Sequence, residues 1–157
     1  MIIQGINEDE YVSCVNQGIT SLHYAEEYSN DKYFYCLMNH TEKAVVAICK
    51  NKDGLMPVVK ECDSHIYVGY GHCIDIIKKE TFLQHNHHVF DSLVYDLLVV
   101  PGRVIAILEL DAVLFDASGG IAKIHQLSDI VTSYRVQYDQ VQIATADGKE
   151  RIINIGP

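Results

Sequence analysis

The fold is decided by the stretch Leu93–Ile155, which begins LVYDLLVVPGRVIAILELDAVLFDASGGIAKIH and ends DIVTSYRVQYDQVQIATADGKERIINI. Short runs rich in β-branched and aromatic residues alternate there with turn residues. Pro101-Gly102 is typical of a type II turn, because proline sets φ at the first central position and glycine accepts a positive φ at the second. Arg103–Leu108 is apolar at nearly every position after the arginine, which predicts a strand buried on both faces. The stretch therefore predicts consecutive antiparallel strands.

The N-terminal half also alternates predicted strands with turn residues, and these strands follow one predicted helix. Asn7 can cap a helix, with Glu10 at the capping-box position, and the sequence predicts a helix from Glu8 to Gln17. Turn residues then separate six predicted strands, which are Ile19–Tyr28, Tyr33–Met38, Ala44–Cys49, Leu55–Lys60, His65–Tyr70 and Cys73–Lys78. Segment Glu80–Leu97 stays open, since its apolar spacing favours a helix while its place in the chain favours strands.

A weak internal repeat runs through the strand-rich region. Residues 66–100 can be laid over residues 104–138 at a period of about 38 residues, and a third copy opens at Val141. This is the spacing of propeller blades, but the units are fewer than a closed propeller needs. We therefore expect a single domain over 1–157 that is mainly β. Consecutive antiparallel β-meanders would form a curled sheet, barrel, sandwich or incomplete propeller, with a short N-terminal helix.

Composition narrows the classes of function. The chain has 157 residues and a formal charge of −9, from 12 Lys and Arg against 21 Asp and Glu, which disfavours direct binding to nucleic acid and favours a basic protein partner. Its 5 cysteines include no CxxC pair, so neither a disulfide framework nor a zinc site is indicated. We find no signal peptide and no segment apolar enough to cross a membrane, and we expect a cytoplasmic protein.

The most conspicuous polar cluster is His85-Asn86-His87-His88, followed by Asp91. On a strand, His85 and His87 would share one face, and Asp91 could complete a two-histidine, one-carboxylate metal site. This HxHxxxD spacing resembles part of the metal motif of the cupins, although the glycine expected six residues earlier is missing. On a helix the two histidines would lie on different faces and the site would fail.

Other catalytic patterns are missing from the sequence. The neighbours His72 and Cys73 would point to opposite faces of a strand, so the histidine could not activate the thiol. Ser118-Gly119-Gly120 has the composition of a hairpin turn, and no GxSxG, P-loop or dinucleotide motif occurs. We therefore expect a protein that is not an enzyme and that needs no cofactor.

Acidic residues and tyrosines gather near the N-terminus. Tyrosine gives rigid contact area and carboxylates steer a basic partner, so the sequence predicts a protein-binding surface in this region. Its candidate residues are Glu8, Asp9, Glu10, Tyr24, Glu26, Glu27, Tyr28 and Asp31.

A small, acidic, mainly β chain with the Glu8–Glu10 run and an acidic N-terminal third resembles the immunity proteins of bacterial toxin systems, such as those of contact-dependent growth inhibition. The resemblance implies an inhibitor that covers the active site of a basic nuclease toxin. A second hypothesis is a propeller-like β interaction scaffold, completed by a partner or by self-association through an open sheet edge. A third is a metal-dependent, cupin-like β-barrel enzyme that uses His85, His87 and Asp91.

Overall fold

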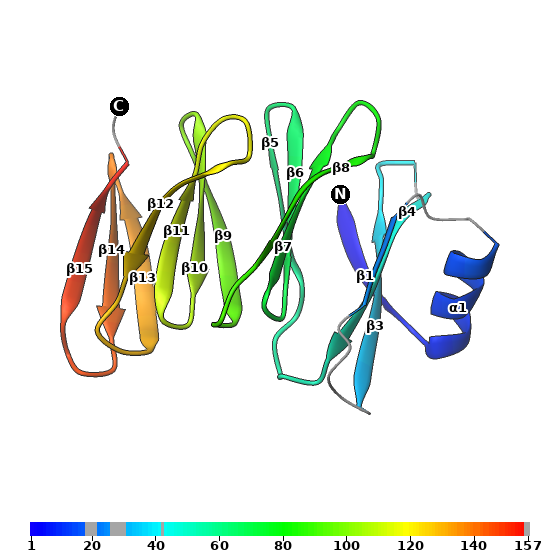
Figure 1. The fold of residues 1–157 in the computed structure, drawn as a ribbon, viewed down its shortest axis with the longest axis horizontal. Helices are drawn as coiled ribbons and strands as arrows, with labels where there is room; N and C mark the ends of the chain where they lie inside the picture. Colours follow the sequence, from blue (N-terminus) through cyan, green and yellow to red (C-terminus); the bar gives the residue numbers. More distant parts are fainter. Residues whose placement is uncertain (18–21, 26–30, 42, 156–157) are drawn as a thin grey trace.

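The computed structural model describes residues 1–17, 22–25, 31–41 and 43–155. Its strands form four sheets that stand in a row, named here A to D in chain order (Figure 1). Sheet A has the order β1 (Ile2–Ile6), β3 (Lys32–Met38), β4 (Ala44–Asn51), β2 (Leu22–Ala25). The helix α1 (Glu8–Asn16) lies at the outer end of the row, beside sheet A.

Sheets B and C are meanders of four strands each, in chain order. Sheet B contains β5 (Val58–Cys62), β6 (His65–Tyr70), β7 (Cys73–Lys78) and β8 (Gln84–Val89). Sheet C contains β9 (Val94–Val100), β10 (Arg103–Leu108), β11 (Asp111–Phe115) and β12 (Ile121–Gln126). Sheet D has three strands, β13 (Val131–Gln137), β14 (Gln140–Thr145) and β15 (Glu150–Asn154).

The predicted fold class is therefore confirmed as an incomplete, propeller-like row of β-meanders with a short N-terminal helix. The aligned runs of the sequence repeat occupy equivalent strands, since β6 to β9 correspond to β10 to β13 and the third copy forms β14 and β15. Pairing is antiparallel throughout sheets B to D, whereas in sheet A strand β2 runs parallel to β4.

Several local predictions need correction. Segment Glu80–Leu97, left open between helix and strand by its sequence, contains β8 and the start of β9. Strand β1 was not predicted, and it forms because its backbone pairs with β3. Strand β5 begins at Val58 rather than Leu55, since the Leu55 carbonyl accepts a hydrogen bond from Lys50 Nζ (2.9 Å) and Pro57 has no N–H for a ladder. The strand predicted over Ile19–Tyr28 lies partly outside the described residues, which retain β2.

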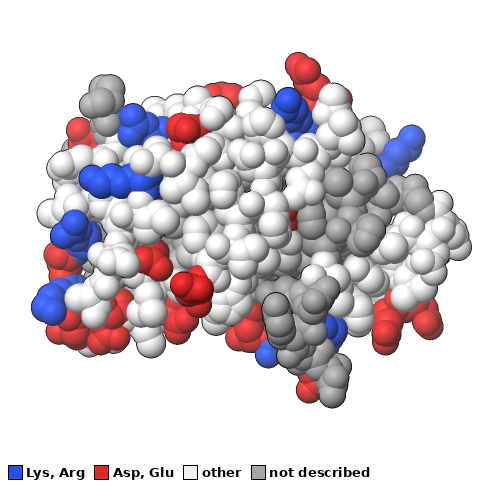
Figure 2. Space-filling model, in the orientation of Figure 1, with Lys and Arg blue, Asp and Glu red and all other residues white. Residues whose placement is uncertain are grey.

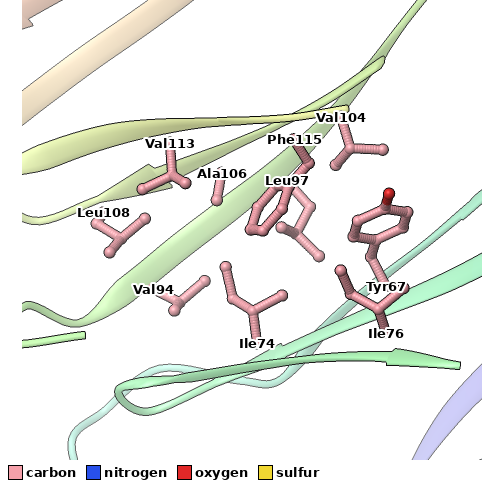
Figure 3. Close-up of a cluster of buried hydrophobic side chains, with 10 residues drawn as sticks. All are labelled: Tyr67, Ile74, Ile76, Val94, Leu97, Val104, Ala106, Leu108, Val113 and Phe115. Atoms are coloured by element: carbon pink, nitrogen blue, oxygen red, sulfur yellow. The ribbon is translucent and has the colours of Figure 1, made fainter. Parts of the chain in front are cut away.

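Three apolar cores hold the row together, one between each pair of neighbouring sheets. The core between sheets B and C is built around Phe115, with Ile74 and Ile76 from sheet B and Leu97 and Val104 from sheet C (Figure 3). Gly69 permits the close approach of these sheets, because a Cβ at this position would lie 2.8 Å from Val94 Cγ1. Each sheet except those at the ends is therefore apolar on both faces.

The helix α1 is set by local sequence and covers the outer face of sheet A. Asn7 Oδ1 accepts from Glu10 N and Glu10 Oε2 accepts from Asn7 N, both at 2.9 Å, which completes the predicted capping box. The Tyr11 ring packs on Phe34 of β3 with centroids 5.3 Å apart. No residue of α1 is buried, so its stability depends strongly on the cap.

We expect Asn7→Ala to lower the free energy of unfolding by about 1 kcal/mol, because the backbone amide of Glu10 loses its acceptor, Asn7 Oδ1. Urea denaturation followed by circular dichroism measures this change. Asp9→Ala is the matched control, since Asp9 lies in the same turn without a cap contact. Equal losses in the two variants would contradict a specific role for the cap.

Candidate functional site

The structure leaves one edge of sheet D without the strand that sheets B and C possess there. In sheet B, β8 pairs with β7, and in sheet C, β12 pairs with β11. The corresponding strand of sheet D is β15, and within residues 1–17, 22–25, 31–41 and 43–155 it pairs with β14 alone. We call this free side of β15 the open edge. An unpaired sheet edge is a template for another extended chain.

The hydrogen-bond phase of β15 shows which backbone groups lie on the open edge. Thr145 N donates to Lys149 O (3.0 Å), and Ile155 N donates to Asp139 O (2.7 Å). In an antiparallel ladder, alternate residues of a strand bond to the same neighbour. The N–H and C=O groups of Glu150, Ile152 and Asn154 therefore point away from β14. Ile152 is also more than half exposed (55%), because its side chain lies with that of Gln142 on the face of sheet D turned away from sheet C.

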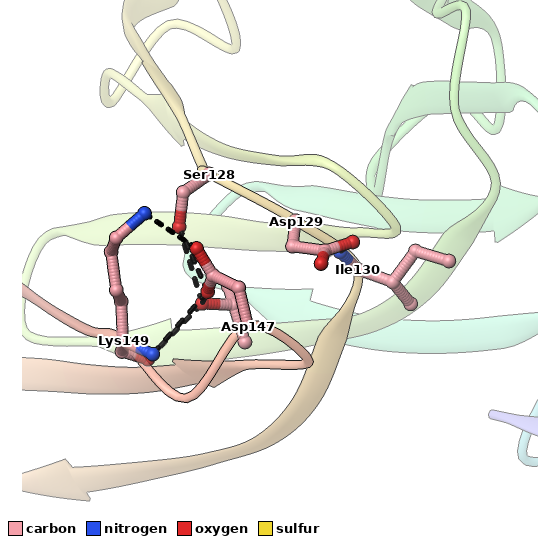
Figure 4. Close-up of polar contacts among 6 residues, drawn as sticks. Ser128, Asp129, Ile130, Asp147 and Lys149 are labelled. Carbon is pink, nitrogen blue, oxygen red and sulfur yellow. Dashed lines mark hydrogen bonds and ion pairs between the residues drawn. The ribbon is translucent and has the colours of Figure 1, made fainter.

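A groove of about 300 Å³ lies at the start of the open edge, between sheet D and the end of β12. Its lining residues are Gln126, Leu127, Ser128, Thr145, Lys149, Glu150 and Arg151. Beside it, Asp147 holds the β14–β15 hairpin by accepting from Thr145 Oγ1 (2.7 Å), Ser128 Oγ (3.2 Å) and Lys149 Nζ (2.6 Å) (Figure 4). Together these contacts hold the pKa of the Asp147 carboxyl below its usual range, and the hydrogen bond from Lys149 contributes most. The groove thus has a fixed wall on the side of sheet D.

Unpaired positive charge lies beside the open edge. Arg151 pairs in the ladder with Ile143, a residue of the core between sheets C and D, so its side chain is on the face toward sheet C. Lys123 pairs with Leu114 of the same core and so faces sheet D. Among the described residues, neither Lys123 nor Arg151 forms an ion pair. Figure 2 shows several Lys and Arg side chains over this end of the row, with acidic residues at its lower margin.

The outer face of sheet D is polar, so it is poorly suited to packing against another sheet. Arg135 Nε donates to Gln142 Oε1 (2.8 Å), and Gln142 Nε2 donates to Glu150 Oε2, so one ladder of polar side chains crosses all three strands. Burying such groups against another apolar sheet is costly. One end of the row is therefore covered by α1, and the other end presents a polar face to solvent. Terminal units of repeat proteins have polar outer faces of this kind.

The structure does not bring the predicted metal ligands together. His85 Nε2 contacts Ser118 O (2.8 Å), whereas His87 Nδ1 contacts Asp75 Oδ1 (2.8 Å). The β-bulge of β8 rotates the two histidines apart, and Asp91 lies beyond the end of the strand. In the part of the chain that the structure describes, no group of three His, Cys, Asp or Glu side chains could hold a metal ion.

Sequence reasoning missed a polar network around Asp75. Asp75 is fully buried and accepts from Tyr70 Oη (2.6 Å) and Gln84 Nε2 (3.1 Å), and His87 Nδ1 lies 2.8 Å away. Burial raises the pKa of the Asp75 carboxyl, and the hydrogen bonds with Tyr70 and His87 oppose this rise. The network could have been predicted from the single acidic residue inside the apolar run CIDII, because an acidic side chain needs hydrogen-bond partners when it is buried. The network satisfies a buried charge within sheet B.

The acidic residues predicted to bind a partner are only partly described. Glu8, Asp9 and Glu10 lie in the exposed first turn of α1, where Glu10 is engaged in the cap. Asp31 is exposed and lies 3.9 Å from Lys52 Nζ. Tyr24 belongs to β2, while Glu26, Glu27 and Tyr28 lie outside the described residues. The predicted binding surface stays a prediction.

The fold is a propeller-like row of four β-sheets. The chain is similar to the computationally designed Ika4 protein (12% identity, TM-score 0.52, covering 82% of this chain and 88% of that one). It is also similar to the designed Ika8 protein (12% identity, TM-score 0.52, 87% and 61%) and to the Neurospora crassa Pan2 WD40 domain (9% identity, TM-score 0.49, 79% and 45%). At these identities the likeness concerns the fold alone.

No protein-family model and no curated protein matches the chain. The helix that the structure describes is too short and too polar to cross a membrane.

Proposed function

We propose that this protein is a β interaction scaffold that binds a partner protein. The observation that carries the proposal is the open row, in which sheets A and D stand at opposite ends and do not close into a ring (Figure 1). Its three cores are formed largely by fully buried aliphatic side chains, so the sheets present a rigid surface. A rigid surface reduces the entropy lost on binding.

Charge adds to this proposal. A formal charge of −9 accelerates encounter with a basic protein through long-range attraction, and that attraction weakens with salt. Inhibition of a basic nuclease toxin would be one use of such a surface. The toxin hypothesis rests on the charge of the sequence and stays a prediction.

The scaffold function is tested by capture followed by reconstitution. Proteins that are cross-linked to the tagged chain in cells of its source are identified, and each is then produced pure. We expect one of them to bind the purified chain with a defined stoichiometry in isothermal titration calorimetry, and with an association rate that falls as salt rises if the partner is basic. Failure of every purified candidate to bind would overturn the proposal.

A further inference from the structure

We propose that Cys14 of α1 and Cys36 of β3 form a redox modification site, where peroxide oxidises the two thiols to a disulfide that fastens the helix to sheet A. This inference is independent of the scaffold function proposed above. It is carried by the register of α1 on β3, by a groove that both cysteines line and by the exposed position of the helix. Both cysteines are free thiols in the structure.

The first step is the register of the helix on the strand. The chain turns back after β1, which is antiparallel to β3, so α1 runs beside sheet A in the direction of β3 (Figure 1). Tyr11 packs on Phe34, with ring centroids 5.3 Å apart. Three further residues of helix advance about 4.5 Å, and two further residues of strand advance about 6.6 Å, each on the same face. Cys14 and Cys36 are therefore the next pair along this contact.

The second step is the space that the two cysteines share. A groove of about 290 Å³ lies between α1 and sheet A, and Cys14 and Cys36 both line it. Their neighbours at this place are small, since Ser13 precedes Cys14 on the helix and Ala47 lies beside Cys36 in the ladder of β3 and β4. The two side chains are close enough to form a hydrogen bond. The thiols therefore face each other at a gap that a small oxidant can enter.

The third step is the difference in reactivity between the two thiols. Cys14 is partly exposed, whereas Cys36 is only 3% exposed. Burial first, and then the neighbouring Cys14, raise the pKa of the Cys36 thiol to about 11. Because the thiolate is the form that reacts with peroxide, the buried thiol is protected. Cys14 is therefore oxidised first, and Cys36 acts as the resolving cysteine.

The oxidation is written with hydrogen peroxide as the oxidant. The Cys14 thiolate attacks one peroxide oxygen, the O–O bond breaks, and the departing hydroxide takes up the thiol proton as water. Cys14 is then a sulfenic acid. Cys36 Sγ attacks Cys14 Sγ, the S–O bond breaks, and the departing hydroxide takes the proton of Cys36 as a second water. Two thiols are thus oxidised to one disulfide while one peroxide is reduced to two waters.

The bond would act on the most weakly held element that the structure describes at this end of the row. No residue of α1 is buried, so the helix can make the small shift that an S–S bond requires and can also open locally. A covalent link to β3 removes the open state in which α1 is separated from sheet A. Oxidation therefore fixes the helix, and reduction releases it.

Cys49 is the competing partner for Cys36. It lies opposite Phe34 in the ladder of β3 and β4, beneath the ring of Tyr11, whose pKa is raised by burial and then by Cys49. Tyr11 therefore stands between Cys49 and the groove. Among the described residues, the cysteines that line the groove are Cys14 and Cys36.

The site is tested by treating the reduced, purified full chain with hydrogen peroxide, blocking the remaining thiols and digesting with trypsin. Trypsin places Cys14, Cys36 and Cys49 on separate peptides, which span residues 1–32, 33–43 and 44–50. We expect mass spectrometry to find peptides 1–32 and 33–43 joined by a link that dithiothreitol reverses, formed at least about tenfold faster than Cys62 is oxidised. A link between 33–43 and 44–50, or oxidation of Cys14 beyond the sulfenic acid without any link, would overturn the inference.

The order of the two steps is tested by removing the resolving thiol. In Cys36→Ala the sulfenic acid of Cys14 has no partner, so we expect dimedone to label Cys14 at least about fivefold more than in the wild-type chain. Cys36→Ser serves if Cys36→Ala unfolds. Cys62→Ser is the matched control, because it removes a partly exposed cysteine of sheet B and should leave the link intact. Equal labelling of Cys14 with and without Cys36 would contradict its role as resolving cysteine.

The effect on the helix is measured by amide hydrogen exchange of the oxidised and the reduced chain. We expect exchange of residues 11–16 to slow at least about tenfold on oxidation, while the amides of β10 stay unchanged. Cys14→Ser should show no such change under the same treatment. A link that forms without slowing exchange in α1 would show that the disulfide does not fasten the helix.

Discussion

Replacing Phe115 with alanine is expected to lower the free energy of unfolding by about 3–5 kcal/mol, the largest effect of any single substitution considered for this protein. Phe115 is fully buried in the core between sheets B and C. Its ring meets Tyr67 edge-on with centroids 5.6 Å apart and lies 5.4 Å from the ring of His88. The substitution therefore removes contacts with both sheets and leaves a cavity where the row is joined at its middle.

Urea denaturation monitored by circular dichroism measures this loss, with Ile124→Ala as the control from the same sheet. Ile124 is 49% exposed, so its truncation removes less buried surface and should cost less than about 1 kcal/mol. Phe115→Leu keeps most of the apolar volume and is expected to fall between the two. A loss below about 1 kcal/mol for Phe115→Ala would show that sheets B and C do not depend on this core.

The second large effect is expected at Asp75. Asp75→Ala should lower the free energy of unfolding by about 3 kcal/mol, because it removes the buried carboxylate that accepts from the Tyr70 hydroxyl and the Gln84 amide. His87→Ala is the control: His87 is partly exposed, so its loss leaves Asp75 with the other two donors. If the two variants unfolded with the same free energy, the network would not depend on the buried carboxylate.

The same residue makes stability depend on pH in a defined direction. Burial raises the pKa of the Asp75 carboxyl, so the folded protein holds this proton more tightly than the unfolded chain does. The stabilising contribution of this proton to the free energy of unfolding is complete below the ordinary carboxyl pKa, and it is lost as pH rises through the raised pKa of Asp75. Asp75→Asn has no such proton. The free energy of unfolding of wild type minus that of Asp75→Asn should therefore fall across this interval, and a difference that rises with pH would contradict the shift.

Much of the fold could be predicted from the sequence because it is encoded locally. Asn7 and Glu10 specify the start of α1, and Gly102, Gly119 and Gly148 all adopt the positive φ values expected of turn glycines. Strands β6, β7 and β10 have the predicted boundaries, since their β-branched residues are buried on both faces. The sequence left Glu80–Leu97 open, because its apolar residues lie partly in turns and partly in β8 and β9, and together they have the spacing of a helix face.

The candidate site could not be predicted in the same way. Lys149, Glu150 and Arg151 look like an ordinary charged hairpin in the sequence, and nothing local distinguishes β15 from β7 or β11. The third copy of the repeat opens at Val141, but the sequence did not reveal which edge of sheet D is free or which side chain faces it. Those properties depend on the register of β15 against β14 and on the packing of sheet D against sheet C.

The sequence by itself determined the mainly β class, the helix and its cap, most turns and the approximate repeat, because propensity, capping and turn geometry act over a few residues. Only the tertiary structure decided the row of sheets, the separation of His85 from His87, the burial of Asp75 and the place of Arg151 on the face of sheet D toward sheet C. Each of these depends on register and on the packing of one sheet against the next. A shift of one residue in a strand moves every side chain to the opposite face, and local sequence alone does not fix that choice.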